Sequence, residues 1–245
     1  MRAESPRTTG SSLARTDFEE AVTAVAALAE PARRALYGFV VAQPEPVSRE
    51  QAASGAGVAR HVAKFHLDKL VEDGLLDFEY RRPPERRGPG AGRPAKVYRR
   101  AQRDISVSVP ERRYEFAGRL LAAAVTDAER DGVPVDEALA RAAREAGREL
   151  AQRARQRAGT RAGTAARRAA ALHVLEESGF EPRSEPDGVT LANCPFHSMA
   201  QDYTALVCGM NLDVVDGLLV GLERTGLEAR LDPAPGRCCV RLCNT

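Results

Sequence analysis

Five cysteines are the residues of this chain whose chemistry is most distinctive. All of them lie in the last 52 of 245 residues, the first in the string NCPFH and two side by side in RCCVRLC. Thiolate sulfur is a soft ligand that favours zinc, copper(I) or iron–sulfur clusters. Free cysteine also packs as a small apolar side chain, but the confinement of all five to one segment argues against casual use in a core. The sequence therefore predicts a metal or iron–sulfur site, with the candidate ligands Cys194, Cys208, Cys238 and Cys239.

The spacing of the cysteines discriminates between the possible sites. Zinc ribbons and fingers place ligands in close pairs, whereas thirteen residues separate Cys194 from Cys208 and twenty-nine separate Cys208 from Cys238. Single thiols spread along the chain suit an iron–sulfur cluster inside a folded domain better than a zinc knuckle. The exception is Cys194 with His197 in CPFH, which could hold zinc together with Cys208 and a C-terminal cysteine. Zinc therefore remains the alternative cofactor.

The last three cysteines are not equivalent. Alternation along CCVRL, read as a strand, places Cys238 on the same face as Val240 and Leu242. This favours Cys238 over Cys239 as the ligand. Cys243 lies close to the end of the chain and is expected to be a free thiol.

The start of the chain and its apolar content indicate a compartment. Residues 1–12 are polar and contain no apolar stretch that resembles a secretory signal, so we expect a cytoplasmic protein. No run of eighteen or more consecutive apolar residues occurs, and we expect no membrane span. A reducing cytosol disfavours disulfides and favours metal binding or redox sensing.

Upstream of the cysteines, apolar periodicity and turn residues predict a winged helix-turn-helix. Its first helix is expected to be capped by Thr16 or Asp17 and to carry an apolar stripe of Phe18, Val22, Val25 and Leu28. A short helix capped by Ser48, the turn SGAG and an amphipathic helix over residues 58–73 form the helix-turn-helix. LLDFEYRR and AKVYRR are typical of two strands, and the loop between them completes a wing. Residues 81–103 hold nine basic residues and one acidic residue. Such a local basic stripe is what contact with DNA phosphates requires.

The predicted DNA contacts come from the helix over residues 58–73 and from the wing. A helical wheel turns Leu67 and Leu70 inward and His61 and Lys64 outward. Basic side chains can donate to guanine edges in the major groove, and Phe65 could meet a thymine methyl or complete the core. The wing tripeptide GRP resembles the core of minor-groove AT-hook peptides. The candidate DNA-binding residues are Arg60, His61, Lys64, Phe65, Arg86, Arg87, Arg93 and Lys96.

Two resemblances to known families accompany these patterns. Three helices with a basic wing, and the run HLDKLVEDGLL, resemble the winged helix-turn-helix of bacterial ArsR-type and related, DeoR-like repressors. The strings NCPFH, VCGMNL, DGLL and RLDPAPGRCC behind such a domain resemble the SufR group of bacterial repressors. This second resemblance spans nearly the whole chain.

The SufR-type resemblance implies a homodimer that carries an iron–sulfur cluster of the 4Fe–4S type. Such a protein would repress genes for the Suf cluster-assembly machinery while the cluster is bound. The matching ligands would be Cys194, Cys208 and one member of the pair Cys238 and Cys239. Cyanobacterial members carry four regularly spaced cysteines, whereas this chain has none between Cys208 and Cys238. Candidates for the fourth ligand are the other member of the pair, His197, Asp202 or an exogenous molecule.

These observations together predict a mainly α protein with an α+β C-terminal domain. The expected parts are a disordered N-terminus (1–15), a winged helix-turn-helix DNA-binding domain (16–103), a helical linker and dimerisation region (104–163) and a cysteine-containing sensor domain (164–245). No Ser/His/Asp set, phosphate-binding glycine loop or HExxH motif occurs, so we do not expect an enzyme. We expect a repressor that binds double-stranded operator DNA, with a winged-helix regulator that carries a structural or sensory zinc site as the alternative.

Overall fold

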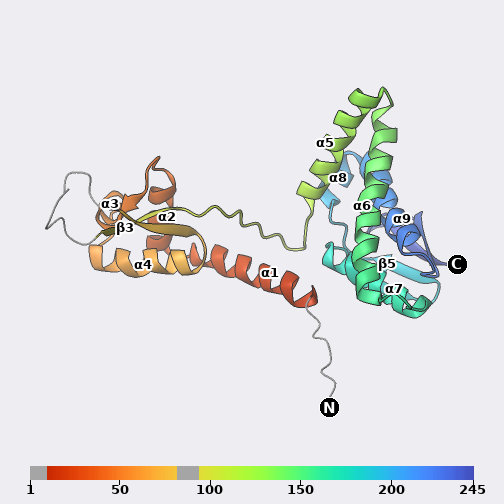
Figure 1. The fold of residues 1–245 in the computed structure, drawn as a ribbon, viewed down its shortest axis with the longest axis horizontal. Helices are drawn as coiled ribbons and strands as arrows, with labels where there is room; N and C mark the ends of the chain where they lie inside the picture. The colour runs from red at the N-terminus through yellow and green to blue at the C-terminus, as the bar shows by residue number, and fades with distance from the viewer. Residues whose placement is uncertain (1–9, 82–93) are drawn as a thin grey trace, which may run out of the picture. The chain divides into compact units, whose positions relative to one another are not determined.

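The computed structural model describes residues 10–81 and 94–245, with side chains from residue 18 onward. The chain divides into two compact units, Met1–Val107 and Ser108–Thr245. Figure 1 draws the N-terminal unit in red to yellow and the C-terminal unit in green to blue. Each unit has its own hydrophobic core, so each is described separately.

The N-terminal unit packs its helices against a small antiparallel sheet with the strand order β1-β3-β2. Its core contains Leu36, Leu67, Leu70 and Tyr98. The elements are α1 (Gly10–Ala27), α2 (Pro31–Val41), β1 (Val47–Ser48), α3 (Arg49–Gly55), α4 (Arg60–Glu72), β2 (Leu76–Arg81) and β3 (Ala95–Arg100). Helices α3 and α4 form the helix-turn-helix, and β2 and β3 are the two strands of the wing.

Local sequence signals explain where these elements begin and end. Ser48 caps α3 in a capping box with Gln51, in which each side chain accepts a hydrogen bond from the other residue's backbone N–H. Gly57 and Gly74 have positive φ angles of 64° and 72°, which glycine adopts without steric cost. These two glycines flank α4 and fix its direction in the helix-turn-helix.

Helix α1 differs from expectation in two respects. It begins at Gly10 rather than at Thr16 or Asp17, so part of the segment that we expected to be disordered is helical. The remainder of that segment, residues 1–9, lies outside the described residues. The second difference is that the predicted apolar stripe of α1 is exposed, whereas Ala21, Ala24 and Ala27 are buried. Alanine fits where the helix lies close to its neighbours, so the larger residues Phe18, Val22 and Val25 remain on the outer face.

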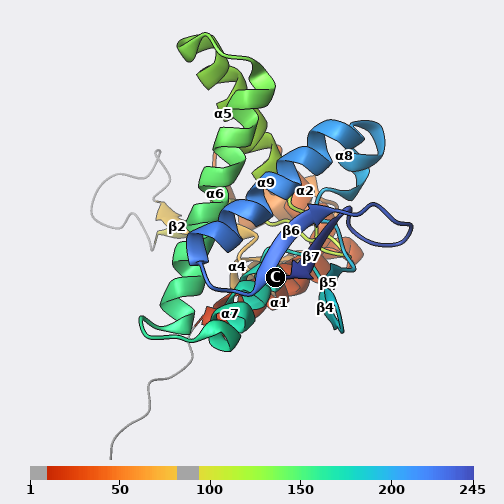
Figure 2. The ribbon, with the colours of Figure 1, turned by 90° about the vertical axis from the view of Figure 1, so that its right-hand side faces the viewer.

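The C-terminal unit combines long helices with an antiparallel sheet of strand order β4-β5-β7-β6. Helix α9 packs against α6, β6 and β7, and Figure 2 shows it crossing α6 beside these strands. The elements are α5 (Tyr114–Asp131), α6 (Val135–Ala158), α7 (Thr164–Glu177), β4 (Pro182–Glu185), β5 (Gly188–Leu191), α8 (His197–Asp202), α9 (Thr204–Leu222), β6 (Leu227–Leu231) and β7 (Val240–Asn244). Helices α5 and α6, which we expected in a separate linker region, share one hydrophobic core with α9 and the sheet.

Glycines allow α6 and α9 to cross with their backbones close together. A Cβ atom at Gly147 would lie 2.8 Å from both the Cα of Gly217 and the backbone nitrogen of Leu218. Real Cβ atoms do not approach so closely, so only glycine fits at this point of α6. The crossing holds α9, which carries Cys208, firmly against α6.

Helix α9 is long and apolar enough, with a mean hydropathy of 1.7, to cross a membrane on length and composition alone. However, more than half of its most apolar window is buried inside the unit. A core helix of this kind passes the same test, so the composition is weak evidence for a membrane. The predominance of helices, with antiparallel sheets and an N-terminal helix-turn-helix, agrees with the predicted fold class.

Candidate DNA-binding surface and cysteine site

The outer face of α4 carries three of the predicted DNA-reading residues. His61, Lys64 and Phe65 are exposed, and Phe65 is the most open of the large apolar side chains near it, at 67%. Ala63 and Leu67 on the opposite face are buried. Phe65 therefore does not complete the core, which was one of its two expected roles. An exposed aromatic beside basic groups can reach a base edge in a groove.

Arg60 begins α4 and forms an ion pair with Glu50 of α3. The hydrogen bond from Arg60 lowers the pKa of the Glu50 carboxyl below its ordinary value. Both side chains are largely exposed, and an exposed pair of this kind contributes only about 0–1 kcal/mol. A DNA phosphate can compete for Arg60, so the pair does not remove it from the candidate surface.

Lys96 occupies a different environment from the free cation expected on the wing. Its Nζ lies 2.5 Å from the Asp68 carboxylate on α4 and 4.2 Å from the centre of the Phe78 ring. The hydroxyl of Tyr98 also donates to Asp68, over 3.3 Å. Lys96 thus joins the wing strands to α4, and it is less available to DNA than Lys64. The remaining wing candidates, Arg86, Arg87 and Arg93, lie outside the described residues.

The geometry of the N-terminal unit is that of a winged helix-turn-helix. Residues 28–77 match the family model described as a helix-turn-helix domain. This match covers α2, α3, α4 and the start of β2, which are the elements that carry the candidate contacts. The chain therefore has a helix-turn-helix DNA-binding domain, which supports a regulator of the winged-helix type. No curated protein and no solved structure matched the chain.

The cysteines of the C-terminal unit come from three separate segments. Cys194 follows β5, Cys208 lies on α9, and Cys238 and Cys239 directly precede β7. Cys194, Cys208 and Cys238 are buried, whereas Cys239 and Cys243 are partly exposed. Cys238 is only 1% exposed and shares its buried environment with Val240 and Leu242, as the alternation along the strand predicted.

Four of the thiols lie close enough to influence one another's ionisation: Cys194 interacts with Cys238, Cys238 with Cys239, and Cys239 with Cys208. The interaction with Cys238, together with burial, holds the pKa of Cys194 well above its ordinary value. Cys194 lowers the pKa of Cys238, but Cys239 and burial outweigh this effect and raise it to about 11. Burial also raises the pKa of Cys208, so Cys194, Cys208 and Cys238 are protonated near neutral pH.

Asn211 is a site residue that the sequence did not single out. It lies on α9 three residues after Cys208 and is completely buried. Its Nδ2 donates a hydrogen bond of 3.1 Å to the sulfur of Cys238, while its Oδ1 is buried and accepts no hydrogen bond from the described residues. A buried unpaired amide oxygen costs about 1–3 kcal/mol. The only signal in the sequence was a polar residue in the otherwise apolar run VCGMNL.

The proposed fourth ligands other than cysteine are exposed residues of α8. His197 and Asp202 lie at the two ends of this helix. In the part of the chain that the structure describes, no hydrogen bond or ion pair joins either side chain to a cysteine. Among the described residues, no group of three or more His, Cys, Asp or Glu side chains is arranged to hold a metal ion.

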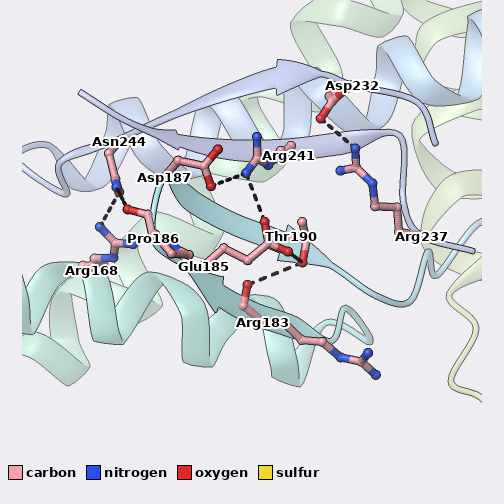
Figure 3. A network of polar contacts seen from close by, with 10 residues as sticks. All are labelled: Arg168, Arg183, Glu185, Pro186, Asp187, Thr190, Asp232, Arg237, Arg241 and Asn244. Carbon is pink, nitrogen blue, oxygen red and sulfur yellow. Dashed lines mark hydrogen bonds and ion pairs between the residues drawn. The ribbon is translucent and has the colours of Figure 1, made fainter.

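Two sets of ion pairs lie around β7 and the loop that precedes it (Figure 3). Arg237 binds Asp232 over 2.6 Å, which closes the loop of residues 232–237 on itself. Arg241 on β7 reaches Asp187 at 2.6 Å and Glu185 at 3.0 Å, and so joins β7 to the β4–β5 hairpin. Glu185, Asp232, Arg237 and Arg241 are among the residues that line a polar cavity of about 380 Å³.

Proposed function

We propose that this chain is a transcription repressor whose affinity for DNA is controlled by an iron–sulfur cluster of the 4Fe–4S type. The observation that carries the proposal is the proximity of four cysteines from segments far apart in the sequence, which lie close enough to influence one another's pKa. A helix-turn-helix domain in the same chain supplies the DNA contact. The cluster would make the protein a sensor of redox state or iron supply.

The residues at the cysteine site fit such a group in their chemistry. Cys194, Cys208 and Cys238 would hold it, with Cys239 as the fourth sulfur, and an all-sulfur set is the one that iron–sulfur clusters use. Asn211 would keep its N–H on the Cys238 sulfur, where a donor stabilises the anionic thiolate. When bound, the cluster supplies electron transfer and a response to oxidants, and it ties the three segments together.

On the DNA side, α4 would enter the major groove with its N-terminal half. His61, Lys64 and Phe65 are the exposed residues of that half, and Arg60 would exchange its Glu50 partner for a phosphate. The basic residues of the wing would add contacts to the backbone or the minor groove. Iron–sulfur assembly genes are the targets that the family resemblance implies.

The repressor is proposed to act as a homodimer that pairs through α5. Tyr114 and Val125 lie on the outer face of this helix and are exposed, whereas Leu120 faces the core. Two copies are what a palindromic operator requires. Sedimentation equilibrium of Val125→Glu checks this arrangement: the variant should be monomeric at concentrations where the wild type is dimeric. An unchanged dimer would place the interface elsewhere.

The decisive experiment is anaerobic purification followed by a visible absorption spectrum, with iron, sulfide and zinc assays on the same sample. A brown protein with about four irons per chain supports the proposal. A colourless protein with one zinc per chain, which also fails cluster reconstitution, supports the alternative zinc-containing regulator.

Two matched cysteine variants connect the cluster to DNA binding. Cys194→Ser should lose iron and bind DNA more weakly, while Cys243→Ser, which changes a partly exposed thiol at the end of β7, should keep both properties. The DNA probe is the duplex that wild-type protein enriches from a random library. Wild-type affinity in Cys194→Ser protein would refute control by the cluster.

A further inference from the structure

Residues 108–113, here called the strap, lead from the DNA-binding unit into α5 and are fastened to the loop that carries Cys194. Nη1 of Arg112 donates to the Asn193 side-chain oxygen over 2.5 Å and to the Cys194 carbonyl over 3.1 Å. The backbone N–H of Arg113 donates to the carbonyl of Pro195 over 3.0 Å. Three consecutive residues around Cys194 are therefore held by two consecutive residues of the strap.

Asn193 holds the strap from the other direction. This residue is buried, and its Nδ2 donates both to the Glu111 carbonyl, over 3.1 Å, and to the Gly179 carbonyl at the end of α7, over 2.6 Å. Its Oδ1 accepts from Arg112. All the polar groups of the side chain are thus in use, and Asn193 joins the strap, α7 and the Cys194 loop at one point.

Few residues separate the contacts of the strap from those of the N-terminal unit along the chain. Arg103 pairs with Glu20 at 3.2 Å, and Ile105 packs against the N-terminal core. At the other end, the Ser108 hydroxyl accepts a hydrogen bond of 2.8 Å from the Arg112 backbone N–H. Only Ser106 and Val107 lie between these two sets of contacts. The strap is therefore the part of the C-terminal unit that is nearest in the chain to the contacts of the N-terminal unit.

We propose that the strap transmits the state of Cys194 to the DNA-binding unit, with Arg112 and Asn193 as positioning residues. This inference rests on the proposed function of the cysteine site. When Cys194 acts as a ligand, its backbone is fixed, and Arg112 and Asn193 pass that constraint to residues 108–113. When Cys194 is released, its loop and the strap loosen together. Coupling between two such sites typically changes affinity roughly 5- to 150-fold.

The test compares the DNA affinity of cluster-loaded and cluster-free protein for wild type and for Arg112→Gln. Wild type should bind the selected duplex at least about 5-fold more tightly when loaded, and in Arg112→Gln that ratio should fall close to one while iron and sulfide content are retained. Arg148→Gln is the matched control, because Arg148 is an exposed residue of α6, outside the proposed dimer helix, that pairs only with Glu145 among the described residues. Its ratio should equal that of wild type.

A second readout does not depend on the cluster. In cluster-free protein, hydrogen exchange in the peptide covering residues 106–116 should be faster in Arg112→Gln than in wild type, and unchanged in Arg148→Gln. If Arg112→Gln does not fold, Ser108→Ala removes the acceptor within the strap while leaving the Cys194 loop intact, and it should lower the affinity ratio in the same direction.

The outcomes separate the inference from the function on which it rests. A wild-type ratio of one would refute the proposed function, and the coupling with it. A large ratio in wild type that persists in Arg112→Gln would leave the repressor intact and overturn the strap alone. Equal weakening of loaded and cluster-free Arg112→Gln would also overturn it, because a purely structural residue lowers both affinities together.

Discussion

Replacing Gly147 by alanine should destabilise the C-terminal unit. Adding a methyl group to α9 where it meets open space, as at Gly209, should not. The Cβ added at Gly147 would lie 2.8 Å from the Gly217 Cα and closer still to the carbonyl oxygen of Val214. Both obstacles are backbone atoms of α9, which cannot rotate away as a side chain would. The two helices must therefore separate at their crossing.

The size of the effect follows from two opposing contributions. Alanine is favoured over glycine inside a helix by about 1 kcal/mol. Overpacking a well-packed core typically costs about 1–3 kcal/mol. Because the added methyl group meets backbone atoms that cannot move aside, the cost at Gly147 should be about 3 kcal/mol or more. The net loss in free energy of unfolding should thus be about 2 kcal/mol or more. For a unit of this size, the melting temperature should fall by roughly 6 °C or more.

The assay is thermal and urea unfolding of the cluster-free full chain, followed by circular dichroism. Gly209→Ala serves as the control on α9 itself, since a Cβ there would meet no described atom within 4 Å. This variant should be as stable as wild type or up to about 1 kcal/mol more stable. If Gly147→Ala were as stable as Gly209→Ala, the close crossing of α6 and α9 would be wrong.

Three further predictions concern the N-terminal unit. Lys64→Ala should weaken DNA binding and reduce the slope of log affinity against log salt concentration by about 1, whereas Lys69→Ala, which removes a cation paired with carboxylates on its own helix, should leave the slope unchanged. Burial and Asp68 raise the pKa of Tyr98 to about 12, compared with about 10 in the unfolded chain. The neutral hydroxyl therefore stabilises the fold below about pH 10, and this contribution is lost as the pH rises towards about 12. Urea titrations across that range should show a steeper loss of stability in wild type than in Tyr98→Phe. Ser48→Ala should cost about 1 kcal/mol through loss of the α3 cap, measurable by the same titration, and no loss would show that the cap is dispensable.

The DNA-binding unit could be predicted closely because its signals are local. The amphipathic period of α4, the Ser48 cap and the glycine after α4 act within one or two turns of helix, and the corresponding elements are found where they were expected. Lys96 shows the limit of this reasoning. Its charge suggested DNA contact, but its partner Asp68 lies 28 residues away on another element, and a basic stripe alone does not reveal such a pairing.

Helix α1 shows a second limit. Phe18, Val22 and Val25 have helical spacing and were expected to face the core, yet these residues are exposed and the small alanines between them are buried. Hydrophobicity ranks the larger side chains first, but the space available in the core decides which of them can enter. Alanine-rich helices such as α1 and α6 can therefore bury the face that a simple hydrophobic pattern would assign to solvent.

The cysteine site depends on two packing events that spacing alone does not encode. Cys208 and Asn211 are placed by α9, whose position is set by the glycine crossing with α6. Cys238 is placed by the sheet, since its backbone N–H donates to Leu191 at the end of β5, over 2.8 Å. The thiols meet where this helix layer and this sheet adjoin, so a ligand shared by Cys208 and Cys238 would join two parts of the core. The Cys194 loop lies at that junction and is also bound to the strap, which is the connection that the proposed coupling to the DNA-binding unit requires.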